Sequence, residues 1–139
     1  MVERTAHPHH FFNKEEKQKI VETIRMAEKN TSGEIRIFLD QKAQESAMDR
    51  AKKVFQRQRM YRSKHRNAVL IYFSLADRSF AILGDEGIHQ RVGDSFWKEV
   101  AELMQGQFSR GQFLEGLEHA IHKIGDEFRK HFVLSRAAN

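Results

Sequence analysis

Asn67-Ala-Val-Leu-Ile-Tyr-Phe-Ser-Leu-Ala-Asp-Arg-Ser-Phe-Ala-Ile-Leu-Gly-Asp85 is the stretch that decides the fold of this 139-residue chain. Residues 68–73 form a near-continuous apolar run, which is typical of a strand covered on both faces. Residues 76–79 have the composition of a turn, and residues 80–83 are predicted to return as a second strand. The stretch therefore predicts an antiparallel hairpin whose first strand is central in a sheet.

A helix, a strand and a second helix are predicted upstream of the hairpin. Asn13 followed by Glu16 resembles a capping box, and apolar residues at helical spacing continue to about Lys29. Residues 34–39 alternate as a strand would, and residues 46–61 predict a helix with one apolar and one basic face. Because a helical crossover joins parallel strands, strands 34–39 and 68–73 are expected to be parallel if they share a sheet.

Two amphipathic helices are predicted in the C-terminal third. The first is expected to begin at Asp94 or Ser95 and to run to about Phe108, and the second follows Gly111 and ends near Phe132. The predicted element order is α-β-α-β-β-α-α. This order predicts an α/β fold, a three-layer α/β/α sandwich with a small mixed sheet.

Composition indicates one ordinary globular domain, with 40% hydrophobic and 31% charged residues. We expect the domain to occupy residues 11–134, with flexible tails at residues 1–10 and 135–139. The absence of cysteine excludes a disulfide framework and a thiolate nucleophile. No stretch approaches the roughly 20 apolar residues of a membrane span, and the N-terminus does not resemble a leader. A cytoplasmic monomer is therefore expected.

The predicted topology brings three polar positions to one edge of the sheet. Strand 34–39 begins at Glu34, strand 68–73 follows Asn67, and the antiparallel strand ends at Gly84 and Asp85. Carboxylate oxygens are the ligands that Ca²⁺ and Mg²⁺ prefer. The candidate metal ligands are Glu34, Asp85, Glu86 and Asp94. The alternative readings are a simple turn at Asp85, solvated side chains at Glu34 and Glu86, and a helix cap at Asp94.

Basic residues gather just before this edge. Between Arg50 and Arg66 the chain carries eight Lys or Arg residues and no Asp or Glu, and its net charge is +5. The candidate residues for binding a substrate or another anion are Asn67, Lys53, Arg57, Lys64 and Arg66. The alternative is a solvated helix face. Nucleic acid is disfavoured as a partner, because few aromatic residues are interleaved for base stacking.

Several motifs in order resemble the TPM domain family, named after a thylakoid lumen phosphatase, a photosystem II repair protein and a worm receptor modulator. They are Asn30-Thr-Ser-Gly-Glu-Ile-Arg36, Asn67-Ala-Val-Leu-Ile-Tyr72, Leu75-Ala-Asp-Arg78, Ala81-Ile-Leu-Gly-Asp-Glu-Gly-Ile88, Phe96-Trp97 and Phe108-Ser-Arg-Gly-Gln-Phe-Leu-Glu-Gly-Leu117. The resemblance covers about residues 13–133. It implies an α/β/α sandwich and, in some members, divalent-cation binding with modest acid phosphatase or nucleotide phosphatase activity. This chain has Ala68 where the family usually has Gly, and we expect it to lack the signal peptide and membrane anchor that many relatives carry.

Two functional hypotheses follow. In the first, a Ca²⁺ or Mg²⁺ ion held by Glu34 and Asp85 activates water toward a phosphorylated small molecule, which would make the chain a metal-dependent phosphatase. In the second, the chain is a noncatalytic interaction module that uses the basic face of helix 46–61 to bind an anionic protein or other anionic partner. No catalytic residue is assigned, because Thr31 and Ser32 suit a helix-to-strand turn.

Overall fold

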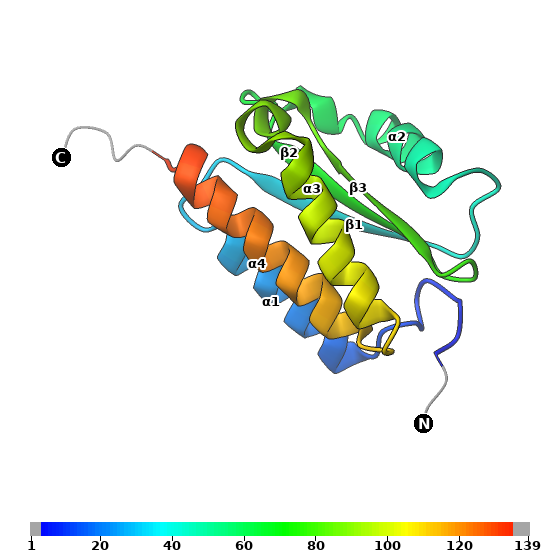
Figure 1. Ribbon diagram of the computed structural model, residues 1–139. Coiled ribbons are helices and arrows are strands. Elements are labelled where there is room, and N and C mark those ends of the chain that lie inside the picture. Colours follow the sequence, from blue (N-terminus) through cyan, green and yellow to red (C-terminus); the bar gives the residue numbers. More distant parts are fainter. Residues whose placement is uncertain (1–3, 135–139) are drawn as a thin grey trace.

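The computed structural model describes residues 4–134, and it confirms the predicted order of elements (Figure 1). The elements are α1 (Lys14–Glu28), β1 (Glu34–Asp40), α2 (Ala47–Arg57), the short 3-10 helix η1 (Met60–Arg62), β2 (Ala68–Ser74), β3 (Ser79–Gly84), α3 (Glu86–Phe108) and α4 (Phe113–His131). Within residues 4–134 no helix is both long enough and apolar enough to cross a membrane.

The sheet has the predicted mixed topology, with strand order β1-β2-β3. β1 is parallel to β2, with Glu34 opposite Ala68, and β2 is antiparallel to β3, with Val69 opposite Gly84. Every residue of β2 is buried, as expected of a central strand covered on both sides.

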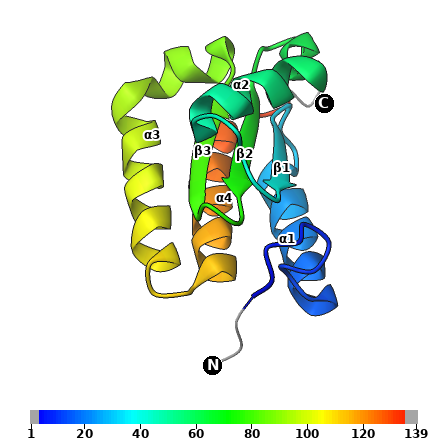
Figure 2. The same cartoon turned by 90° about the vertical axis from the view of Figure 1, so that its right-hand side faces the viewer.

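Helices cover both faces of the sheet, as predicted (Figures 1 and 2). Val69 and Ile71 point into a core shared with α1, α3 and α4, whereas Leu70 and Tyr72 point into a smaller core under α2. This alternation along β2 follows from the two-residue period of a strand. The molecule is a three-layer sandwich with one helix on one face and three on the other.

Helix α3 begins earlier than predicted. It starts at Glu86, with Asp85 as its N-cap, and continues through a non-helical Gly93 at φ 77°. The predicted start at Asp94 or Ser95 matches the second of two helical segments that meet at Gly93, whereas the first segment, which begins at Glu86, was not predicted. Gly93 is non-helical, at φ 77° and ψ 173°, and joins the two segments at a kink, while the fully buried Ile88 anchors the first segment in the core.

The expected flexible tail at residues 1–10 needs correction for its described part. Arg4 donates to both carboxylate oxygens of Glu16, at 2.7 and 2.5 Å, and to the carbonyl oxygen of Phe11 at 2.7 Å. Its guanidinium also lies 5.4 Å and 5.3 Å from the ring centroids of Phe11 and Phe12. These contacts hold the segment against the domain. They could not be predicted from hydrophobic periodicity, because they are made by the charged side chain of Arg4. The tail expected at residues 135–139 lies outside the described residues.

Candidate functional site

The predicted strand edge is present as a set of hydrogen bonds between the ends of the three strands. Asn67 Nδ2 donates to Ser32 Oγ at 2.9 Å, which joins the start of β2 to the turn before β1. The backbone N–H of Asp85 donates to the carbonyl of Ala68 at 2.9 Å, and that of Gly87 donates to the carbonyl of Arg66 at 2.8 Å. Connectivity therefore placed these positions correctly.

Arg66 and Asp85 form the central ion pair of this edge. Arg66 Nε donates to Asp85 Oδ2 at 2.7 Å, and Arg66 Nη2 donates to Asp85 Oδ1 at 2.8 Å. Arg66 Nη1 also donates to Glu86 Oε1 at 3.2 Å. The hydrogen bonds to Asp85 raise the pKa of Arg66 above its ordinary value. One guanidinium therefore binds two adjacent carboxylates.

Asp85 has a structural task in addition to this ion pair. Its Oδ1 accepts a hydrogen bond from the backbone N–H of Glu86 at 2.8 Å, which caps α3. The Asp85 side chain is only 6% exposed, whereas those of Arg66 and Glu86 are 40% and 64% exposed. The Arg66 guanidinium therefore lies between the buried Asp85 carboxylate and the solvent.

The other two predicted ligands contact basic side chains of their own elements. Glu34 Oε2 accepts from Arg36 Nε at 2.9 Å on β1. Asp94, whose side chain is 98% exposed, lies 3.4 Å from His89 Nε2 across the kink of α3. Throughout residues 4–134, no group of three or more His, Cys, Asp or Glu side chains is placed to hold a metal ion. The four acids are not gathered into one cluster in this structure.

Asn67 lies beneath the edge with an unsatisfied polar atom. The residue is fully buried, and its Oδ1 has no hydrogen-bond partner among the described residues. A buried amide oxygen without a donor is costly, so such atoms are uncommon in native proteins. Because Asn67 is covered, it can position Ser32 but cannot meet an anion at the surface.

The basic segment divides into paired and unpaired cations. Arg50 pairs with Asp40 at 3.1 Å, and Lys53 pairs with Glu45 at 2.9 Å. Five exposed cations form no ion pair with another residue of the described chain, and we call them the basic rim: Lys52, Arg57, Arg59, Arg62 and Lys64. They lie on α2, around η1 and in the turn before β2. The predicted anion contact Lys53 is therefore partly engaged, whereas Arg57 and Lys64 are available.

A surface hollow of about 200 Å³ adjoins the Arg66–Asp85 pair. It lies where α2, η1, the end of β3 and the cap of α3 meet. Its lining is formed by Lys52, Phe55, Gln56, Tyr61, Arg66, Leu83, Gly84 and Asp85. Sequence reasoning did not single out Lys52 or Tyr61 as site residues, although Lys52 lies within the basic run. Only their convergence on Arg66 and Asp85 in three dimensions gives them this position.

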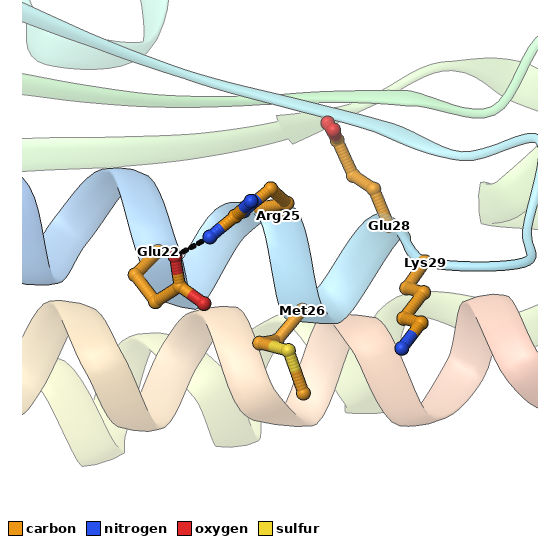
Figure 3. A pocket seen from close by; sticks show the side chains of 5 residues that line it. All are labelled: Glu22, Arg25, Met26, Glu28 and Lys29. Carbon is orange, nitrogen blue, oxygen red and sulfur yellow. Dashed lines mark hydrogen bonds and ion pairs between the residues drawn. The ribbon is translucent and has the colours of Figure 1, made fainter.

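A larger hollow, of about 540 Å³, lies elsewhere and is lined by one helix (Figure 3). Its lining residues are Glu22, Arg25, Met26 and Glu28 on α1, and Lys29 directly after this helix. Glu22 and Arg25 form an ion pair with each other. Glu28 points toward β1 and accepts from the backbone N–H of Ile35 at 2.8 Å. Its polar groups serve local pairing, so this hollow offers less ligand chemistry than the strand edge.

Fold and edge together define a small α/β/α sandwich domain with an acid–arginine cluster and a basic rim at the strand ends. A model of the TPM domain matches residues 6–127, and the chain belongs to the TPM domain family. The solution NMR structure of the BA42 protein from the psychrophilic bacterium Bizionia argentinensis is similar, with 42% sequence identity and a TM-score of 0.85. That match covers 91% of this chain and 88% of BA42. No curated protein matches this chain.

Proposed function

We propose that this TPM domain binds a divalent cation, Mg²⁺ or Ca²⁺, together with a phosphorylated small molecule, at the edge formed by Asp85 and Glu86. One observation carries the proposal: two carboxylates converge on a single positive charge, that of Arg66, beside a hollow that also contains Lys52. The carboxylates are suited to a cation, and the neighbouring side chains are suited to phosphate oxygens.

The donor atoms fit a hard cation in type, since all are oxygens. Mg²⁺ is commonly held by one or two carboxylates, with waters and substrate phosphates completing its shell. Two converging carboxylates therefore suit Mg²⁺ bound with a phosphorylated ligand better than a cage made of protein groups alone. Glu34 and Asp94 are candidate additional ligands, and they would act only after leaving Arg36 and His89.

The basic rim supplies the second part of the proposed ligand site. Lys52 faces the hollow beside Arg66, and the remaining rim cations surround the same end of α2. Exposed cations without acidic partners raise the local concentration of an approaching phosphate. In this arrangement Lys52 and Arg66 bind the phosphate directly, whereas Arg57 and Lys64 attract it from a distance.

Weak acid phosphatase or nucleotide phosphatase activity is the catalytic form of this proposal. A bound divalent ion supplies positive charge that polarises the phosphoryl group. Asp85 and Glu86 hold that charge in place, while Arg66 and Lys52 orient the phosphate oxygens. Ser32 Oγ accepts from Asn67 Nδ2, so its hydroxyl is held as part of the turn and water is the proposed nucleophile.

Asp85→Asn tests the cation site, because asparagine retains the helix cap but removes the charge. Mg²⁺ and Ca²⁺ titrations, with and without inorganic phosphate, are followed by thermal melting and calorimetry. The matched control is Asp126→Asn, which removes an exposed acid paired with Arg129 on α4. We expect cation-induced stabilisation in the wild type and the control but none in Asp85→Asn. An equal response in all three proteins contradicts the site, and turnover of p-nitrophenyl phosphate by the same proteins tests catalysis separately.

A noncatalytic interaction module remains the second candidate, favoured by the five unpaired cations of the basic rim. It predicts salt-sensitive binding of a polyanion such as polyglutamate. The double substitution Arg57→Glu with Lys64→Glu should abolish this binding. The double substitution Lys123→Glu with Lys130→Glu, which makes the same charge change on α4, should retain most of it. Equal loss in both variants would mean that only net charge matters.

A further inference from the structure

Asp85 and Glu86, the two acids proposed to bind a metal cation, already bind the positively charged side chain of Arg66. Arg66 makes two hydrogen bonds to Asp85, at 2.7 and 2.8 Å, and one to Glu86 at 3.2 Å. Two carboxylates and one guanidinium leave this group of charges with a net charge of −1. A divalent ion in place of the guanidinium would bring the carboxylate pair to neutrality. The pair is therefore better balanced by a divalent cation than by arginine.

The backbone around Arg66 can stay in place while its side chain moves. The carbonyl oxygen of Arg66 accepts from the backbone N–H groups of Gly87 and Ile88, at 2.8 and 3.2 Å, which binds this residue to the start of α3. The chain segments approach so closely that a Cβ on Gly87 would lie 2.0 Å from the carbonyl oxygen of His65. These contacts do not involve the guanidinium, so its release requires only side-chain rotation.

Exposure of the side chains shows the direction in which this rotation can occur. Asp85 is 6% exposed, whereas Arg66 is 40% exposed and Glu86 is 64% exposed. The guanidinium lies on the solvent side of Asp85, and the hollow that contains Lys52 and Tyr61 lies against it. An anion bound in this hollow would offer the guanidinium new acceptors and draw it away from the carboxylates.

We propose that Arg66 is a built-in competitor for the cation site, which keeps Asp85 and Glu86 occupied until an anion in the neighbouring hollow draws the guanidinium away. The inference rests on the proposed function and adds its regulation. Cation binding and anion binding are then coupled through one side chain, and by linkage each tightens the other.

Arg66→Gln tests this competition with the metal ion alone as the probe. Without divalent ions the variant should melt at a lower temperature than the wild type, since a buried carboxylate loses its partner. On titration with Mg²⁺ or Ca²⁺ its apparent affinity should be at least tenfold tighter, and its melting temperature should rise more than that of the wild type. Arg66→Lys, which retains the charge but not the bidentate geometry, should be intermediate.

Arg62→Gln is the matched control, because it removes a rim cation that has no ion pair with the described acids. Equal tightening in Arg62→Gln and Arg66→Gln would overturn the competition and leave only a general charge effect. If Arg66→Gln does not fold without divalent ions, recovery by Mg²⁺ or Ca²⁺ supports the inference, and Arg66→Lys provides the affinity comparison. Cation binding that depends on Asp85 but not on Arg66 would refute this inference alone, whereas no binding in any variant would refute the cation site itself.

Discussion

Glu28 is a half-buried carboxylate that protects the outer edge of the sheet. It accepts from the backbone N–H of Ile35 on the edge strand β1, and Figure 3 shows it pointing from α1 toward that strand. Burial raises the pKa of Glu28, the hydrogen bond from Ile35 opposes this effect, and the charge of Glu34 raises the pKa further. The folded protein therefore binds the proton of Glu28 more tightly than the unfolded chain does, although this side chain is the acceptor for a backbone N–H of the edge strand.

Glu28→Gln should stabilise the protein at pH 7 by about 0.5 kcal/mol or less, because partial exposure screens the charge. The glutamine oxygen can still accept from Ile35. A raised folded pKa means that Glu28 contributes most below its unfolded pKa of about 4.3, and that this contribution is lost as pH rises through the folded pKa. Urea unfolding at pH 4 and pH 7 should show the gain only at the higher pH. Glu22→Gln on the same helix is the control, and a gain of equal size at both pH values would contradict the charge explanation.

At the scale of elements, β3 and α3 pack closely where Gly84 meets the ring of Trp97, and this contact leaves no room for an added side-chain atom. A Cβ at Gly84 would lie 2.3 Å from the Trp97 ring. Gly84 ends β3 and is followed directly by Asp85, the N-cap of α3. The packing of Trp97 against Gly84 therefore helps to fix the position of the Asp85 carboxylate. The sequence indicated a turn at Gly84 and Asp85 but not the tryptophan above it. Residues far apart in the chain decide that contact.

Gly84→Ala should destabilise the protein by about 1–3 kcal/mol, since Trp97 must move to admit the methyl group. Gly106→Ala within α3 is the opposite case, because its nearest neighbour would lie at 4.0 Å. Alanine there should stabilise by about 0.5–1 kcal/mol through helix propensity. Chemical denaturation followed by the fluorescence of the single tryptophan measures both changes. A neutral Gly84→Ala would show that Trp97 has room to shift.

At the scale of the whole molecule, the two ends of the sheet have different tasks. Asn67 and Asp85 define the proposed ligand end. At the other end, the guanidinium of Arg78 lies 5.1 Å from the ring centroid of Phe11, and Arg4 ties the N-terminal segment to the start of α1. Arg4 and Arg78 at this second end are paired with an acid or placed over aromatic rings, which indicates a stabilising function.

Arg4→Ala should cost about 1–3 kcal/mol of stability, because it leaves Glu16 unpaired and removes cation–π contacts. Lys14→Ala, at an exposed cation of the same region, should have little effect. Mg²⁺ affinity should stay unchanged in Arg4→Ala, because Arg4 lies at the end of α1 opposite to the ligand edge. Urea unfolding and a cation titration measure these two properties. A large change in affinity would mean that the two ends are coupled.

Local sequence determined the element order, the mixed sheet and the meeting of Ser32, Asn67 and Asp85 at one edge. These features follow from hydrophobic periodicity and from the connections between consecutive elements, and both can be recognised in the local sequence. The helix boundary near Gly93 was predicted, whereas the helical segment from Glu86 to that kink was not, because only the tertiary structure shows that Ile88 is buried.

Tertiary structure decided how the central pair of predicted ligands, Asp85 and Glu86, is engaged. Arg66 and Asp85 are separated by 19 positions, and their bidentate pairing depends on how two loops approach each other. Glu34 and Asp94 instead contact neighbours in their own elements, Arg36 on β1 and His89 across the kink of α3. A pattern of residue types gives the charges present at an edge, whereas the directions of side chains decide which charges neutralise each other. For this reason the sequence located the edge, and only the structure showed that an arginine occupies it.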